Sequence, residues 1–129
     1  MILVDSSVWI DYFNGVSTRE SELLDSHLGT EPLLTGDLIL TEVLQGFRSD
    51  RDFRSAKAAL ETLIFEPMVG HDIAVASARN YRKLRERGIT VRKTIDVLIA
   101  TFCIAGGHRL LHSDRDFTLM AAPLRLQTI

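Results

Sequence analysis

Five acidic residues could carry chemistry, and three of them, Asp96, Asp114 and Asp116, stand where a folding argument alone would not place them. Asp5 follows a short apolar run at the start of the chain, and Asp114 follows another near its end, two residues before Asp116. Asp96 interrupts an apolar helical face, where an unpaired charge would cost several kcal/mol or stay protonated. Glu42 completes the set. Like charges brought together repel unless a cation neutralises them, so this combination predicts a metal site.

The chemistry of such a site follows from its oxygen ligands. Carboxylates select hard cations such as Mg²⁺ or Mn²⁺, and no Cys/His pair has zinc spacing in this chain. A carboxylate cage around such ions can activate water for in-line attack on phosphorus and stabilise the leaving oxygen. We therefore expect phosphodiester hydrolysis. Acid–base chemistry through His108 and His112 is an alternative, but histidines flanking so short a strand segment are better explained as structural or surface groups.

The elements expected around these acids would bring two of them to one rim. Residues 2–4 predict a buried strand, Ser6 and Ser7 cap a helix through Phe13, and 109–112 predict a second strand-like run. Between them we expect helices over 20–28, 38–47, 50–64, 72–87 and 94–105, strands over 32–35 and 67–69, and after them a helical turn over 117–121 and a last strand over 124–129. This alternation indicates an α/β fold with a largely parallel sheet covered on both faces. Ligands bind at the carboxyl ends of such strands, where Asp5 and Asp114 lie.

Each acid also has a purely structural explanation. Asp5 can bond the backbone of the next turn, Asp96 can favour the helix dipole, and Asp114 and Asp116 can cap a helix. Glu42 shares the polar stripe of its helix with Thr41, Gln45 and Gly46, as a solvated glutamate would. Only their joint placement favours a metal site.

Composition bounds the class of protein. A chain of 129 residues, with 46% hydrophobic and 25% charged residues, predicts one soluble globular domain over residues 1–129. No apolar run approaches a membrane span or a signal-peptide core. The single cysteine, Cys103, falls on an apolar helix face and is expected to be a buried, inert thiol, as in a reducing cytoplasm.

Charge is distributed unevenly around a net value of −2. Residues 79–93 contain seven Lys or Arg and one acid, which gives +6 locally and leaves −8 for the rest. Most such strips are solvated faces, but beside a phosphate-cleaving site this one could contact RNA. Arg82 and Arg85 are its candidate RNA contacts.

The chain resembles VapC toxins of the PIN-domain family over nearly all 129 residues. The resemblance rests on four motifs in order and spacing: I-L-V-D-S-S, T-E-V-L-Q-G, T-I-D-V-L-I-A and L-L-H-S-D-R-D-F. It implies a three-layer α/β/α domain, Mg²⁺- or Mn²⁺-dependent endoribonuclease activity, a homodimer, and inhibition by a VapB antitoxin whose tail crosses the site. Many members carry threonine where this chain has His112, which leaves the hydrogen bonds around Asp114 open.

The resemblance also implies roles for individual residues. Asp5, Glu42, Asp96 and Asp114 match the acidic quartet of the family, Asp116 is an additional acid, and Ser6 and Ser113 are supporting residues. Asp5, Asp96 and Asp114 would hold the metal, Glu42 would position or deprotonate the attacking water, and Asp116 would complete the shell or a weaker second site. The alternatives are another Mg²⁺-dependent α/β phosphohydrolase and a non-catalytic PIN-like RNA-binding module.

Overall fold

Four short parallel strands form the sheet of the computed structural model, which describes all residues from 1 to 129. They are β1 (Ile2–Val4), β2 (Leu33–Gly36), β3 (Ile64–Glu66) and β4 (Arg109–Leu111), in the spatial order β3-β2-β1-β4. Leu3 of β1 pairs with Leu34 on one side and with Leu110 on the other, and all three are fully buried. A run of Ile, Leu and Val is what a strand buried on both faces requires.

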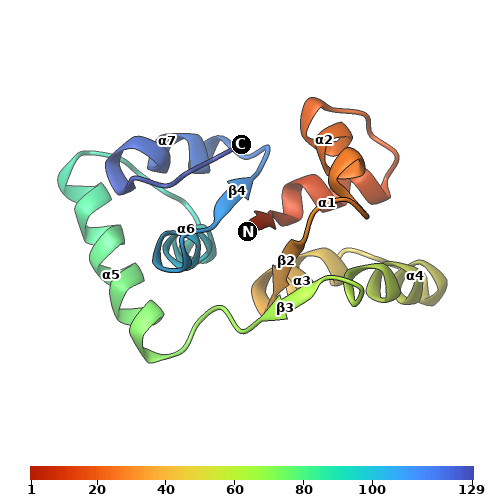
Figure 1. Ribbon diagram of the computed structural model, residues 1–129. Coiled ribbons are helices and arrows are strands. Elements are labelled where there is room, and N and C mark those ends of the chain that lie inside the picture. The colour runs from red at the N-terminus through yellow and green to blue at the C-terminus, as the bar shows by residue number, and fades with distance from the viewer.

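Seven helices cover the sheet in two groups. The first group is α1 (Ser6–Phe13), α2 (Arg19–His27), α3 (Asp37–Leu44) and α4 (Asp50–Leu60), and the second is α5 (His71–Glu86), α6 (Thr94–Gly106) and α7 (Arg115–Leu124). Figure 1 shows the two groups on opposite sides of the strands, with contacts inside each group between α1, α2 and α3 and between α5, α6 and α7. The expected three-layer arrangement is confirmed. None of these helices is long and apolar enough to cross a bilayer.

Helix α6 is the central helix of its group. Its buried residues point in several directions around the axis, so it lies inside the molecule rather than on its surface. Gly107, in the left-handed conformation at φ 67°, ends it as expected. Asn80 of α5 donates a hydrogen bond of 2.9 Å to the Thr101 hydroxyl, which in turn donates to the Val97 carbonyl. This bond fixes α5 against α6.

The strand order creates a switch point between β1 and β4. From β1 the chain adds β2 and then β3 on one side, and only later places β4 on the other side. Ligands of open parallel sheets bind beside the carboxyl ends of the strands at such a point. Asp5 directly follows β1, and Asp114 lies three residues after β4.

The expected third strand was placed too late in the sequence. Residues 67–69 follow β3 rather than forming it, and Ile64, which we assigned to the preceding helix, begins the strand. Proline has no N–H to donate, so Pro67 ends the ladder. Met68 is instead fully buried, and its N–H donates to the Asp37 carboxylate at 3.1 Å.

Several helix boundaries also differ from expectation. Asp5, not Ser6 or Ser7, caps α1, and Gly70, not Asp72, stands at the cap of α5. Helix α3 ends at Leu44, earlier than the expected Phe47, whereas α7 spans ten residues rather than a single turn. The expected last strand over 124–129 is reduced to one bridge, between Leu110 and Thr128. Neighbouring short polar residues can each cap the same helix, so the hydrophobic pattern of the sequence does not fix a helix boundary to within one or two residues.

Gly36 at the end of β2 gives a test of packing between β2 and the segment after β3. A Cβ there would meet the Met68 side chain and would lie 2.7 Å from the Glu66 carbonyl oxygen, which belongs to the backbone. We expect Gly36→Ala to lower the free energy of unfolding by about 1–3 kcal/mol, as overpacked sites do. Gly46→Ala is the control, because its Cβ would meet only the Val43 carbonyl at 3.6 Å. Equal denaturant midpoints for the two variants would contradict this account.

Candidate active site

A cavity of about 270 Å³ opens at the carboxyl ends of the strands, and four carboxylates line it. They come from four separate elements: Asp5 after β1, Glu42 on α3, Asp96 on α6 and Asp114 before α7. The other lining residues are Ser6, Ser7, Ile10, Gln45 and Lys93. The structure therefore brings together all four members of the expected acidic quartet.

Asp5 uses one carboxylate oxygen in a structural contact and leaves the other unpaired. Its Oδ2 accepts hydrogen bonds from the Ser7 N–H at 3.0 Å and from the Ser7 hydroxyl at 2.6 Å, which caps α1. Its Oδ1 is buried and has no hydrogen-bond partner in the protein. Burial raises the pKa of Asp5 above its usual value, although the bonds from Ser7 oppose that shift. The free oxygen is an acceptor without a donor.

Glu42 is half-buried on the cavity-facing side of α3. The Ser6 hydroxyl donates a hydrogen bond of 3.1 Å to its Oε1, so Ser6 contacts Glu42. Burial raises the pKa of Glu42, and the charge of Asp5 adds to the rise. The polar stripe of α3 thus faces an acidic cavity.

Asp96 lies in the first turn of α6 with only 3% of its surface exposed. Its Oδ2 is buried without a hydrogen-bond partner. Burial, together with the charges of Asp114 and Asp5, raises its pKa from 3.8 to about 7. A favourable position at the helix N-terminus does not offset these two effects, so the helix dipole alone does not explain this residue.

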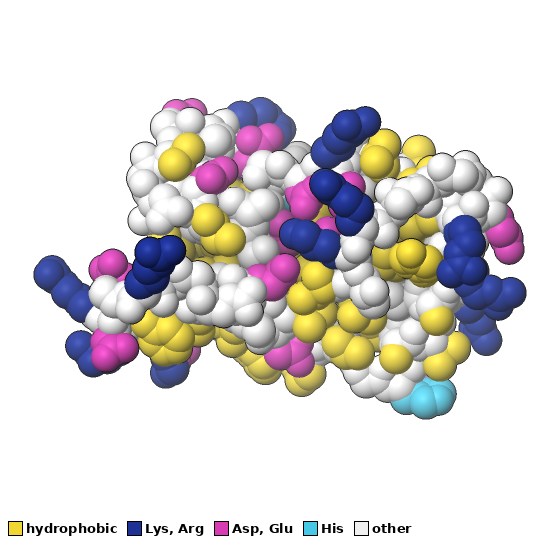
Figure 2. Space-filling view, turned by 180° about the vertical axis from the view of Figure 1, so that it is seen from behind, with side chains coloured by type: hydrophobic (Ala, Val, Ile, Leu, Met, Phe, Trp, Pro, Cys, Tyr) yellow, Lys and Arg dark blue, Asp and Glu magenta, His cyan; other side chains and the backbone are white.

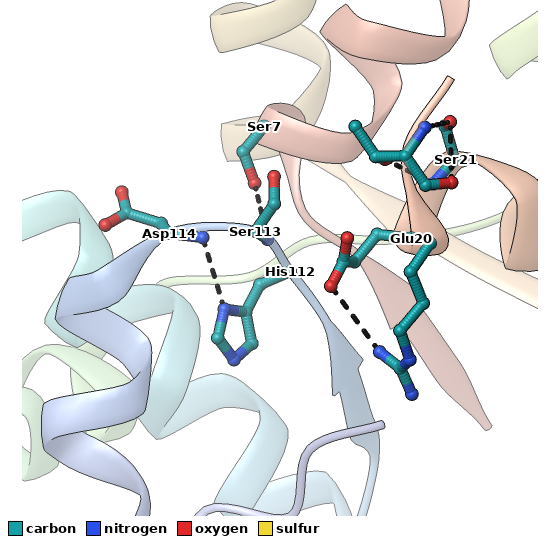
Figure 3. A network of polar contacts seen from close by, with 8 residues as sticks. Ser7, Glu20, Ser21, His112, Ser113 and Asp114 are labelled. Carbon is teal, nitrogen blue, oxygen red and sulfur yellow. Dashed lines mark hydrogen bonds and ion pairs between the residues drawn. The ribbon is translucent and has the colours of Figure 1, made fainter. Parts of the chain in front are cut away.

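Asp114 caps α7 by accepting the Asp116 N–H at 2.9 Å with its Oδ1. Its own N–H donates to Nδ1 of His112 at 3.3 Å, which leaves the other ring nitrogen of His112 to carry the proton (Figure 3). His112 packs on Phe117 with ring centroids 5.2 Å apart, and its burial lowers its pKa, which favours this neutral form. His112 therefore accepts the bond that a threonine hydroxyl at this position could also accept.

Ser7 joins the two loops that carry Asp5 and Asp114. Its hydroxyl donates to Asp5 at 2.6 Å. It also accepts the backbone N–H of Ser113 at 3.2 Å (Figure 3). The Asp5 N–H also donates to the Leu111 carbonyl at 2.9 Å, extending the pairing of β1 with β4. The relative position of the two acids is thus fixed by backbone and hydroxyl contacts on both sides of the switch point.

Not every expected site residue reaches the cavity. Asp116 is buried but does not line it, and Ser113 contributes its backbone N–H rather than its side chain. Arg82 and Arg85 lie on α5 and line a separate, mainly apolar groove of about 500 Å³ against α6, where the Arg85 guanidinium stands 5.3 Å from the Tyr81 ring centroid. Cys103 is fully buried with its pKa raised to about 12 by that burial, as expected for an inert thiol.

Three polar residues that line the cavity, Ser7, Gln45 and Lys93, were not expected there from the sequence. We treated Lys93 only as the end of the basic strip, although it precedes Asp96 by three residues and begins the same helix. Ser7 was expected as a cap, whereas it bridges two loops. A space-filling view of the molecule (Figure 2) shows acidic side chains near the middle of one face with Lys and Arg side chains beside them. The mixture of charges at the cavity is not visible in the net charge of the chain.

Repulsion in the cavity leads to a prediction about metal-free protein. Because the folded pKa of Asp96 lies above its unfolded value of 3.8, its contribution to stability declines as pH rises from about 4 to about 7. In chelator at about pH 8, we expect Asp96→Asn to raise Tm by at least about 4 °C, the shift that roughly 1 kcal/mol gives at this chain length. At about pH 5 the gain should shrink, because wild-type Asp96 is then mostly protonated.

Asp25→Asn is the control for that measurement, since Asp25 is an exposed aspartate on α2 and its substitution makes the same change in net charge. Thermal scans of both variants at the two pH values decide the matter. If Asp96→Asn does not raise Tm, or raises it equally at both pH values, repulsion among the carboxylates does not destabilise the metal-free protein as described.

The family model for the PIN domain matches residues 2–123. Ribonuclease VapC11 of Mycobacterium tuberculosis is 32% identical over 132 aligned residues, covering 98% of this chain and 96% of the relative. Ribonuclease VapC32 of the same organism is 34% identical over 117 residues, covering 89% and 86%.

Among solved structures, VapBC2 from Rickettsia felis, bound to a DNA fragment from its promoter, contains a chain of the same fold. Its TM-score is 0.79 at 16% identity, with 100% of this chain and 98% of that chain covered. At that identity the likeness shows the fold alone. The match to the family model and the relatives aligned along most of their length show that this chain belongs to the PIN-domain family, as a VapC-type member.

Proposed function

We propose that this protein is a Mg²⁺- or Mn²⁺-dependent endoribonuclease and the toxin of a VapBC toxin–antitoxin pair. The observation that carries the proposal is the cavity lined by Asp5, Glu42, Asp96 and Asp114, in which two buried carboxylate oxygens have no hydrogen-bond donor. The relatives named as VapC ribonucleases support RNA as the substrate. The acids themselves do not distinguish RNA from DNA, because hydrolysis by activated water does not use the 2′-hydroxyl.

The residues present fit a hard divalent cation by their chemistry. Unpaired, buried oxygens such as Asp5 Oδ1 and Asp96 Oδ2 favour a cation, and an oxygen-only set favours Mg²⁺ or Mn²⁺. In their present conformations no three Asp, Glu, His or Cys side chains are grouped closely enough to hold an ion, so binding would require side-chain rotation within the cavity. When bound, the ion would supply a Lewis acid that activates water and stabilises the departing oxygen.

The protein side chains would then have separate roles. Asp5, Asp96 and Asp114 would hold the ion. Glu42, oriented by Ser6, would position the attacking water or remove its proton. Asp116 would act through its backbone N–H on Asp114, because its side chain does not line the cavity.

The partners follow from the same site and from the relatives. We infer an antitoxin of the VapB type, because the relatives are VapC ribonucleases and a chain of the same fold was solved as a VapBC assembly. A guanidinium from such a partner could pair with two carboxylate oxygens of the cavity at once and so compete with the metal. From the resemblance to VapC toxins we also infer a homodimer. A substrate of cellular RNA would place it in the cytoplasm.

Cleavage assays test the metal mechanism directly. Purified protein should cleave single-stranded RNA with Mg²⁺ or Mn²⁺ and stop in chelator, giving 5′-phosphate and 3′-hydroxyl ends. Asp5→Asn and Asp96→Asn should each lower the rate by on the order of a hundredfold or more, because an amide keeps the shape but loses the charge that binds the ion. Asp25→Asn should cleave normally. Undiminished cleavage in chelator would rule out the metal mechanism.

The arginines of α5 give a second test, on RNA affinity. We propose that Arg82 and Arg85 attract RNA phosphates toward a site that would otherwise repel them. Replacing both by Ala should weaken RNA binding and reduce the salt slope by about 1–2, with little change in the rate for bound RNA. The matched control is Arg51→Ala with Arg54→Ala on α4, two exposed arginines in the other helix group. If both double variants lose the same RNA affinity, binding depends on the net charge of the protein and not on the position of Arg82 and Arg85.

A further inference from the structure

Lys93 is the one basic side chain among the residues that line the acidic cavity. It stands with four carboxylates around the same space, yet none of the ion pairs in the protein includes it. Its ammonium therefore lies more than 4.0 Å from every carboxylate oxygen. An exposed lysine at an acidic cavity, not committed to any acid, is available to a ligand.

The position of Lys93 in the chain is unfavourable for stability. It is the N-cap residue of α6 and provides no side-chain hydrogen bond to the helix. Ser, Thr, Asp or Asn at this position would provide one, and a positive charge at a helix N-terminus opposes the dipole. Residues that break a local rule without a structural gain are expected at functional sites. Because α6 also carries Asp96 one turn later, the helix fixes the two opposite charges relative to each other.

We propose that Lys93 is the phosphate-contacting cation of the cavity, which pairs with the backbone phosphate of RNA next to the bond to be cut. The proposal rests on the proposed function for the identity of the ligand. A phosphodiester carries a negative charge that four carboxylates repel, and an ammonium held at the same cavity reduces that repulsion. Lysine suits this role because its charge is compact and its stem is flexible.

The same charge has an opposite effect on a divalent cation. A positive group at the cavity repels Mg²⁺ or Mn²⁺ and lowers their affinity for the carboxylates. Removing the charge of Lys93 should therefore tighten metal binding while weakening RNA binding. A lysine with a purely structural role would not move the two affinities in opposite directions.

Calorimetric titration with Mn²⁺ alone tests the first effect without any RNA. We expect Lys93→Met to bind Mn²⁺ about three- to tenfold more tightly than wild type, and Lys93→Arg to stay near wild type. Arg92→Met is the matched control, because Arg92 is the exposed neighbour and does not line the cavity. Unchanged or weaker Mn²⁺ binding by Lys93→Met would overturn the proposal.

RNA affinity is measured in the cleavage-deficient Asp5→Asn background, with a fluorescein-labelled single-stranded oligoribonucleotide in chelator. Adding Lys93→Met should weaken binding about three- to tenfold and reduce the salt slope by about 1, and Lys93→Arg should restore both. Equal losses for Lys93→Met and Arg92→Met would overturn the phosphate contact, because any surface cation would then do the same. A further outcome is that wild type fails to cleave RNA while Lys93→Met still tightens Mn²⁺ binding and weakens RNA binding. In that case the ribonuclease proposal is wrong and the proposed phosphate contact of Lys93 stands.

Discussion

Repulsion among four carboxylates in one cavity is the constraint on which the rest of this structure depends. Burial and the neighbouring charges raise the pKa of Asp5, Glu42 and Asp96, so each charged group is held at a cost in stability. This cost in stability is offset by the burial of apolar side chains away from the site. The strands β1, β2 and β4 and the helix α6 form a continuous apolar core that includes Leu3, Leu34, Leu110 and Ile99, all fully buried. A core of this kind can hold charged groups together without help from the groups themselves.

The structural and the functional explanations of the acids turn out to be compatible. Asp5 and Asp114 are helix caps, and each uses one carboxylate oxygen on the backbone of the next turn. Since a carboxylate has two oxygens, capping still leaves Asp5 Oδ1 buried without a donor in a residue that lines the cavity. The capping bond also restricts the side-chain rotamer of Asp5, so the contact that stabilises the helix limits where the free oxygen can lie. An acid with one oxygen committed loses less entropy on binding a cation than a freely rotating one would.

The sequence predicted which acids come together at one cavity better than it predicted the boundaries of the elements around them. Strands β1, β2 and β4 follow from short apolar runs ending in turn residues, and the shared rim of Asp5 and Asp114 follows from parallel pairing. The third strand was displaced because Pro67 and Met68 resemble a strand start, whereas Ile64 and Phe65 are exposed at the sheet edge and carry little burial pattern. Lys93 and Ser7 were missed as cavity residues for a different reason. Their roles depend on which side of a helix start or loop they face, and that is set by contacts between elements distant in sequence.

Helix α6 connects the acidic cavity to the basic helix through its two sides. Lys93 and Asp96 line the cavity, whereas Thr94, Val97 and Leu98 line the groove that Arg82 and Arg85 border from α5. Because α5 and α6 are packed together and joined by the bond from Asn80 to Thr101, the distance between arginines and acids is set by helix packing rather than by a mobile loop. Under the proposed ribonuclease function, a strand of RNA bound by α5 would therefore meet the acids at a fixed offset. The cut would then fall at a defined place relative to the bound phosphates, and α6 would set that place.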